Sequence, residues 1–160
     1  MRRVWLSVCL ASVAILFFSL AFLPVSYQHD LEMRVSCLAN MKCISLAVLM
    51  YAQDHGQLLP PKPKAGLIKD IIDFHYSTKN EGEWHCPKQE KTFISYALAE
   101  AMLGTSLKKL NDPSQTVGWF ECKGDSGRDW GAISADLEVR HRGFANYGYL
   151  DGHVNSLRAP

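Results

Sequence analysis

The sequence has almost no excess of charge of either sign. Its 17 lysines and arginines are mixed along the chain with 16 aspartates and glutamates, which leaves a formal net charge of +1. The basic cluster Arg140-His141-Arg142 is short and typical of a solvated turn. Because nucleic-acid-binding domains carry a basic patch or stripe that follows the phosphates, we expect no nucleic acid among the partners.

The sequence also lacks the common catalytic motifs. It contains no glycine-rich phosphate loop, no His-Glu-x-x-His and no Gly-x-Ser-x-Gly. Residues 122–127, CKGDSG, resemble the nucleophile loop of trypsin-like serine proteases, but Arg128 stands where that loop has its second glycine. The upstream Ala-Ala-His-Cys block is missing too, so a polar turn explains the loop better. We therefore expect no enzyme.

Internal repeats and low-complexity tracts are absent, and 160 residues predict one domain with appendages. Cysteine is sparse, and one of the five cysteines, Cys9, lies in the apolar N-terminal stretch. The other four are Cys37, Cys43, Cys86 and Cys122. This even number fits disulfides if the domain is exported.

The N-terminal stretch is the longest uncharged run. Residues 4–23 contain no charge and, as a helix, would span about 30 Å, the thickness of a bilayer core. Arg2 and Arg3 precede this run, so the positive-inside rule places the N-terminus in the cytoplasm. We predict a single-pass inner-membrane protein whose domain is periplasmic. A signal peptide cleaved near Ser19-Leu20-Ala21 is the alternative.

A long amphipathic helix is predicted over residues 31–56. The apolar residues that recur there in steps of three and four are Leu31, Val35, Leu38, Met41, Ile44, Val48 and Tyr51. Gly56 follows the last of them, where a left-handed cap is expected, and Pro60 prevents continuation of the helix. A helix with such a face needs a second layer packed along it.

The elements predicted after this helix are shorter. Residues 67–75 repeat apolar residues at helical spacing, and residues 93–103 are interpreted as a strand passing into a helical turn. Residues 116–122 predict a strand whose face with Gly118, Phe120 and Cys122 packs on the helix. In the last part, Asp151-Gly152 separates two short strand candidates, which predicts a hairpin with a type I′ turn.

These elements together predict an α+β fold. We expect a transmembrane signal-anchor in residues 1–23, a hinge in residues 24–28, and a domain in residues 29–160. In that domain a small C-terminal antiparallel sheet packs on the long helix.

This order of elements resembles type IV pilins and type II secretion pseudopilins. Residues 37–42, CLANMK, and residues 51–56, YAQDHG, are similar to the helix of a large planctomycete-type pseudopilin-like family. Later blocks of that family resemble Cys86-Pro87, Ser95-Tyr96, and residues 113–117 with Glu121. The most specific match is the family's His-x9-Asp-Gly signature, carried here by His141, Asp151, Gly152 and His153. The resemblance covers roughly residues 35–157.

The usual leader of that family is not recognisable in residues 1–23, which contain neither its Gly-Phe peptidase site nor its glutamate. The chain thus resembles a pilin-type domain carried on a plain signal-anchor. The resemblance implies a membrane-anchored, exported structural or interaction protein in a type II secretion or type IV pilus-like assembly. Its expected partners are the membrane and other proteins, and we expect no cofactor.

An exported domain that binds a metal or small ligand is the alternative. His141, Asp151 and His153 would form a site if the hairpin folded back on the loop of His141, and imidazoles with a carboxylate suit Zn²⁺. A purely structural His141, hydrogen-bonded to the backbone of its turn, competes with this interpretation. Asp125 or Asp129 with loop carbonyls would resemble the calcium site of some major pseudopilins.

The four cysteines after the anchor allow three pairings. Cys37 and Cys43 lie six residues apart on one predicted helix. Their Cα atoms are about 9 Å apart along the axis, beyond the about 7 Å limit for bridged cysteines, so each would pair with Cys86 or Cys122 off the helix or stay reduced. The resemblance implies Cys37–Cys86, because the family usually has cysteine at both places. Cys43–Cys122 is then the additional pair.

Overall fold

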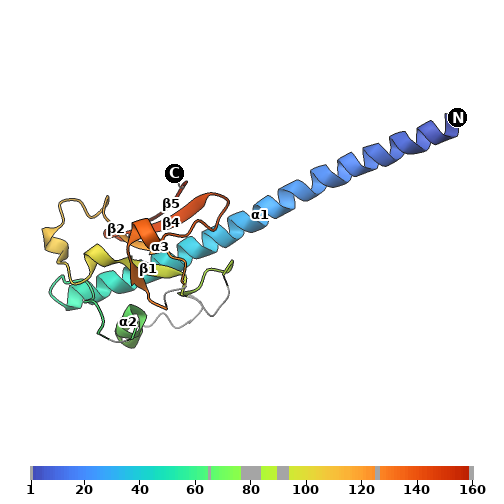
Figure 1. Ribbon diagram of the computed structural model, residues 1–160. Helices are drawn as coiled ribbons and strands as arrows, with labels where there is room; N and C mark the ends of the chain where they lie inside the picture. Colours follow the sequence, from blue (N-terminus) through green and yellow to red (C-terminus); the bar gives the residue numbers. More distant parts are fainter. Residues whose placement is uncertain (1, 65, 77–83, 90–93, 125–126, 159–160) are drawn as a thin grey trace. The chain divides into compact units, whose positions relative to one another are not determined.

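The computed structural model describes residues 2–64, 66–76, 84–89, 94–124 and 127–158, with the backbone alone for residues 2–11, 14, 16–25 and 73–76 (Figure 1). The chain forms two compact units, Met1–Glu32 and Met33–Pro160. Helix α1 (Arg2–Asp54) makes up the first unit and begins the second. It continues through residues 24–28, where the sequence predicts a hinge, without a helix end.

Helix α1 lies near the N-terminus, and it is long and apolar enough to be a membrane span or a signal sequence. Among the described side chains, the stretch Ser26–Asp54 is this apolar, and its 18-residue apolar segment has a mean hydropathy of 1.6 and is 44% buried inside the domain. In the predicted anchor, the described side chains include Val13 and Ile15, which are exposed. The position of the span in residues 4–23 and its orientation stay predictions.

The second half of α1 provides the core face of the domain. Met41, Ile44, Val48 and Tyr51 are buried, as the apolar stripe predicts. Val35 is 55% exposed, so the N-terminal part of the predicted stripe is wrong. At about 100° per residue, Val35 and Val48 point about 140° apart, because steps that are mostly shorter than the helical repeat drift around the axis. The helix ends as predicted, with Gly56 at φ 67°.

A five-stranded, mostly antiparallel sheet packs on this face, which confirms the α+β fold. The strands are β1 (Tyr96–Ala99), β2 (Val117–Glu121), β3 (Trp130–Gly131), β4 (Phe144–Tyr149) and β5 (Val154–Arg158), in the order β3-β1-β2-β4-β5. Only β3 pairs in parallel, with β1. Strand β1 passes into the 3-10 helix η2 (Glu100–Met102), as predicted, and η3 (Leu107–Lys109) follows. The two-residue β3 and the short helix α3 (Ile133–Asp136) were not predicted, since neither is long enough to show a period.

The sides of strand β2 are the reverse of the prediction. Trp119 belongs to the core shared with α1, whereas Phe120 and Cys122 lie in a second cluster with Ala97, which Ile133, Leu137 and Tyr147 cover. Successive strand residues alternate between faces, so Glu121 falls on the same side as Trp119. The prediction placed the face of Gly118, Phe120 and Cys122 against the helix, and both faces of β2 carry a large aromatic residue, so the strand pattern alone does not identify the inner face.

Helix α2 (Ile68–Tyr76) agrees with the predicted second helix, and a distant side chain caps it. The buried Asp129 accepts hydrogen bonds from the backbone N–H groups of Ile68 (2.8 Å) and Lys69 (2.6 Å). Burial raises the pKa of Asp129, against the effect of these bonds. Both carboxylate oxygens are thus occupied by the helix start. Asp125, the other residue of the calcium hypothesis, lies outside the described residues.

Replacing Asp129 with alanine should lower the free energy of unfolding by about 2–3 kcal/mol, because two backbone donors of α2 lose their acceptor in a buried place. Asp70→Ala is the matched control. Asp70 accepts one exposed hydrogen bond, from the Leu67 N–H at 3.0 Å, so its loss should be about 1 kcal/mol or less. Chemical denaturation of both variants measures the difference. Equal effects would contradict a capping role for Asp129.

The C-terminal hairpin is confirmed, but its turn type is not. Strands β4 and β5 pair through Gly148 and Val154, and the Gly152 N–H donates to the Tyr149 carbonyl at 2.9 Å. Gly152 has φ 90°, while Asp151 is outside the left-handed region, which fits a three-residue loop with a glycine bulge. Positive φ at both central residues instead occurs at Arg142 and Gly143. This pair joins His141 to Phe144, so the type I′ turn precedes β4.

Candidate functional site

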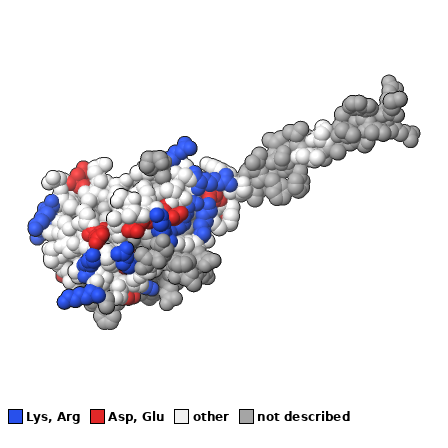
Figure 2. Space-filling model, in the orientation of Figure 1, with Lys and Arg blue, Asp and Glu red and all other residues white. Residues whose placement is uncertain are grey.

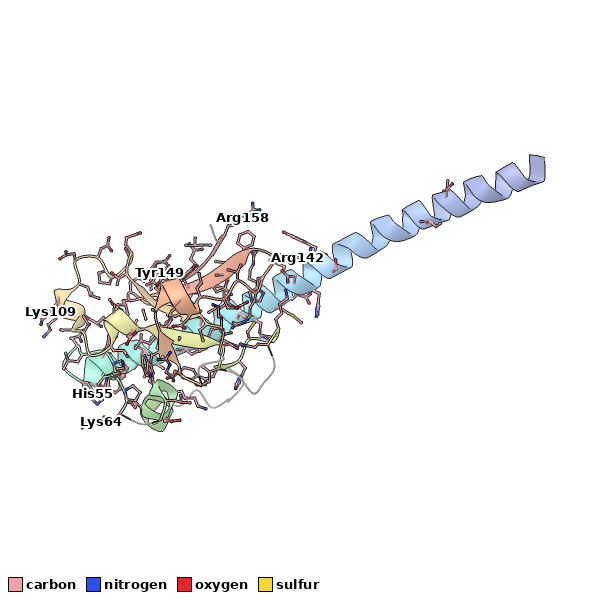
Figure 3. The ribbon with its side chains drawn as sticks, in the orientation of Figure 1. His55, Lys64, Lys109, Arg142, Tyr149 and Arg158 are labelled. Atoms are coloured by element: carbon pink, nitrogen blue, oxygen red, sulfur yellow. The ribbon has the colours of Figure 1, made fainter. Side chains whose placement is uncertain are left out.

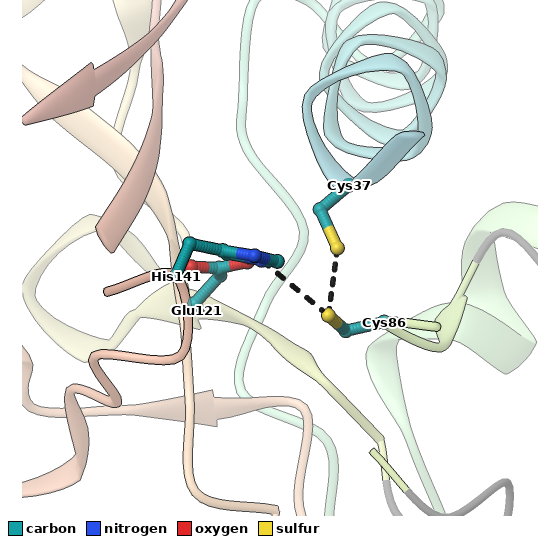
Figure 4. A group of neighbouring side chains, drawn as sticks. All are labelled: Cys37, Cys86, Glu121 and His141. Atoms are coloured by element: carbon teal, nitrogen blue, oxygen red, sulfur yellow. Dashed lines mark hydrogen bonds and ion pairs between the residues drawn. The ribbon is translucent and has the colours of Figure 1, made fainter. Parts of the chain in front are cut away.

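Four buried side chains from separate segments converge beside helix α1. Cys37 comes from α1, Cys86 from the loop before β1, Glu121 from the end of β2, and His141 from the turn before β4. Each is at most 1% exposed, and their ligand-type atoms lie within 4.8 Å of one another. Figure 4 shows Cys86 between Cys37 and the paired side chains of His141 and Glu121. We call these four residues the buried cluster.

Local contacts hold Cys86 in place. The Cys86 N–H donates to Ser95 Oγ at 2.7 Å, and the Ser95 N–H donates to the Trp84 carbonyl at 2.9 Å. Trp84 itself packs edge-on against Trp119, with ring centroids 6.1 Å apart. This segment is therefore buried at Trp84 and Cys86, and Cys86 contacts Cys37 on α1.

The two cysteines of the buried cluster are in contact. Cys37 Sγ donates to Cys86 Sγ at 2.7 Å, and Cys86 Sγ lies 3.6 Å from His141 Nε2. The bond to Cys86, together with burial, raises the pKa of the Cys37 thiol. The bond from Cys37 lowers the pKa of Cys86 to about 5, against the effect of burial and with help from His141. Of the two sulfurs, that of Cys86 is therefore the one favoured to ionise.

Glu121 links the histidine to strand β4. Its Oε2 accepts from the Asn146 N–H at 3.0 Å, and its Oε1 accepts from Asn146 Nδ2 and lies near His141 Nε2, both at 3.1 Å. Burial lowers the pKa of His141, but the contacts with Cys86 and Glu121 outweigh burial and raise it to about 9. When no metal ion is bound, this raised pKa favours the protonated imidazole of His141 next to Glu121.

The other signature residues lie elsewhere. Asp151 and His153 are at the hairpin tip, where Asp151 Oδ1 accepts from the His153 N–H at 3.0 Å and contacts its Nδ1 at 2.6 Å. Chiefly the bond from the His153 N–H lowers the pKa of Asp151. His141 precedes β4 and Asp151 follows it, and six strand residues span about 20 Å. Figure 3 labels Arg142 and Tyr149 near these two ends. The structure therefore does not bring the predicted trio of His141, Asp151 and His153 together.

Gly152 has a separate role at the hairpin tip. Its carbonyl accepts a hydrogen bond from Lys42 Nζ on α1. A Cβ atom added at Gly152 would lie 2.9 Å from Leu49 Cδ1, also on α1. The Asp-Gly part of the signature thus makes a turn that fits closely against the helix.

The predicted cysteine pairs have different outcomes. Cys37 and Cys86 are brought together, although no disulfide joins them. Cys43 is exposed on α1, whereas Cys122 is buried in the cluster on the other side of the sheet, so the structure does not bring these two together. Burial raises the pKa of the Cys122 thiol to about 11. The prediction failed for this pair because it assigned Cys122 to the wrong face of β2.

The sequence analysis named Glu121 only as part of a family-like block, and it predicted no role for Asn146. A signal was present for Glu121, since it is the one charged residue in the apolar strand β2. Its contact with His141 could not be foreseen, because the two residues meet only after β2 and β4 pair.

No protein-family model, curated protein or solved structure matches the chain. The pilin-like arrangement therefore rests on the chain itself, in which a long apolar N-terminal helix packs against a sheet.

Proposed function

We propose that this protein is a membrane-anchored, exported pseudopilin-like structural or interaction protein, and that it acts by assembly with other proteins. An uncovered apolar face of α1 is the observation that carries the proposal. A type II secretion or type IV pilus-like assembly is the setting that the sequence motifs favour.

The uncovered face lies opposite the core face of the helix, and the hairpin tip borders it at Leu46, whose Cδ2 would lie 4.0 Å from a Cβ added at Gly152. Val35, Leu46 and Met50 on this face are 55%, 46% and 52% exposed. They extend over about 22 Å of helix axis, at 1.5 Å per residue. The lysine between them, Lys42, donates to the Gly152 carbonyl. Single exposed apolar residues are ordinary on a monomer, but a row of them along one helix marks an interaction site.

The charge distribution supports a protein partner. Figure 2 shows Lys and Arg interspersed with Asp and Glu on the visible face of the second unit, without a continuous basic region. Together with the net charge of +1, this pattern does not favour binding to phosphates. The uncharged residues 4–23 behind Arg2 and Arg3 support the anchor and its orientation.

Cys43 offers a direct test, because it is exposed on α1 close to the uncovered face. A membrane-impermeant bismaleimide added to intact spheroplasts should cross-link the full-length chain through Cys43, either to itself or to one partner. Val35→Glu and Met50→Glu should abolish the product, since a charge in an apolar contact is costly to desolvate. Leu157→Glu is the matched control, because Leu157 is 42% exposed on β5.

The cross-linking results with permeant and impermeant reagents test the assembly of the protein and its membrane orientation separately. A product that forms only with a permeant cross-linker would contradict the exported domain and leave assembly standing. A product that persists in Val35→Glu and Met50→Glu would show that the uncovered face is not the contact. A chain that stays monomeric with both reagents would contradict the assembly proposal.

A further inference from the structure

We propose that Cys37, Cys86, Glu121 and His141 together bind one zinc ion, which joins helix α1 to the sheet. This inference concerns the interior of the domain, and it stands whether or not the uncovered face takes part in assembly.

The donor set is that of a structural zinc site. Zinc sites of four protein ligands use thiolates, imidazole and, less often, a carboxylate, at about 2.3 Å for sulfur and about 2.0–2.2 Å for nitrogen and oxygen. Two sulfurs exclude Ca²⁺ and Mg²⁺, which take oxygen ligands. All four groups are buried, so no position is left open to solvent or substrate. A closed set of this kind serves structure and not catalysis.

Two distances in the buried cluster are close to those of a tetrahedral set, and all four ligand-type atoms lie within 4.8 Å of one another. The metal–ligand lengths above put neighbouring ligand atoms about 3.3–3.8 Å apart in a tetrahedron. His141 Nε2 is 3.6 Å from Cys86 Sγ and 3.1 Å from Glu121 Oε1. The sulfurs, 2.7 Å apart, would separate by about 1 Å, which a small rotation of the Cys37 side chain about χ1 provides. Binding would put the imidazole proton on Nδ1 and leave Nε2 to face the metal.

A second layer of contacts already orients two of the ligands, Glu121 and Cys86. Asn146 holds both oxygens of Glu121 through its N–H and its Nδ2. Ser95 Oγ holds the backbone of Cys86. Such partners position metal ligands in proteins, and their loss typically weakens metal binding by about 10–100-fold.

Charge explains why all four groups meet. A disulfide between Cys37 and Cys86 would involve only the two sulfurs and would leave the pair of Glu121 and His141 outside the bond. Two thiolates and a carboxylate around Zn²⁺ leave one net negative charge, with the histidine neutral. The ion therefore uses every member of the buried cluster.

Metal analysis of the full-length chain, purified in detergent from zinc-supplemented cells, tests the site. We expect one zinc per chain in the wild type and in Cys43→Ser, the matched control outside the buried cluster. Cys86→Ser and His141→Ala should bind none. Asn146→Ala, which keeps all four ligands, should need about 10–100-fold less chelator for half-release of the zinc.

A spectroscopic measurement on the wild type avoids variants that fail to fold. Exchange of zinc for Co²⁺ should produce thiolate-to-cobalt charge transfer and the strong visible bands of a tetrahedral site. Metal-free protein in which peptide mapping finds a Cys37–Cys86 disulfide would overturn the proposal. Reduced protein that takes up neither Zn²⁺ nor Co²⁺ would overturn it as well.

Discussion

Replacing Glu121 with alanine is expected to lower the free energy of unfolding by about 3–5 kcal/mol, the usual cost of removing one partner from a buried ion pair. Glu121 is fully buried and contacts His141 and Asn146 through both oxygens. Its removal leaves a buried imidazole and two amide donors without their acceptor. Denaturant titration of the full-length protein in detergent, with chelator present throughout, measures this loss apart from any metal.

Two comparisons make the interpretation specific. Glu100→Ala removes an exposed ion pair with Lys62 at 2.9 Å, so it should change stability by about 1 kcal/mol or less. In a double-mutant cycle, Glu121→Ala with His141→Ala should cost less than the sum of the single losses, because each single variant leaves the other group unpaired. Additive losses would show that the two side chains do not depend on each other.

The outline of the fold followed from sequence because it depends on local patterns. Gly56 after the last periodic residue marked the end of α1, and the glycine-containing turn at residues 151–152 marked the last hairpin. Strand β3, with two residues, has no period to detect, and it joins the sheet only by pairing with β1. Elements of that kind are determined by tertiary contacts.

The candidate site was harder to predict than the fold. The sequence singled out Cys37, Cys86 and His141, but it paired His141 with Asp151 and His153, which are near in sequence and far apart across β4. The side of β2 was also misassigned, because Trp119 and Phe120 on its two faces are both buried and the alternation alone cannot tell which face meets α1. Glu121 is buried although it is charged, because His141 and Asn146 contact its carboxylate. Those contacts exist only in the assembled sheet.

The second large effect is expected at the hairpin tip, where Gly152→Val should lower the free energy of unfolding by about 2–6 kcal/mol. Two causes combine at this position. Its φ of 90° is unfavourable for a β-branched residue, and the new Cβ would lie 2.9 Å from Leu49 Cδ1 on α1. Backbone strain of this kind costs about 1–3 kcal/mol, and overpacking adds a similar amount.

Gly143 separates these two causes, because it has nearly the same backbone angle, φ 88°, but no atom within 4 Å of an added Cβ. Gly143→Val should therefore show the backbone cost alone, about 1–3 kcal/mol. In a Leu49→Ala background, Gly152→Val should destabilise the protein no more than Gly143→Val does, since the obstructing methyl group is gone. Equal losses for the two glycines in the unaltered background would mean that the hairpin tip does not pack on α1. A gap that closes only when Leu49 is shortened would establish that contact as the role of Gly152.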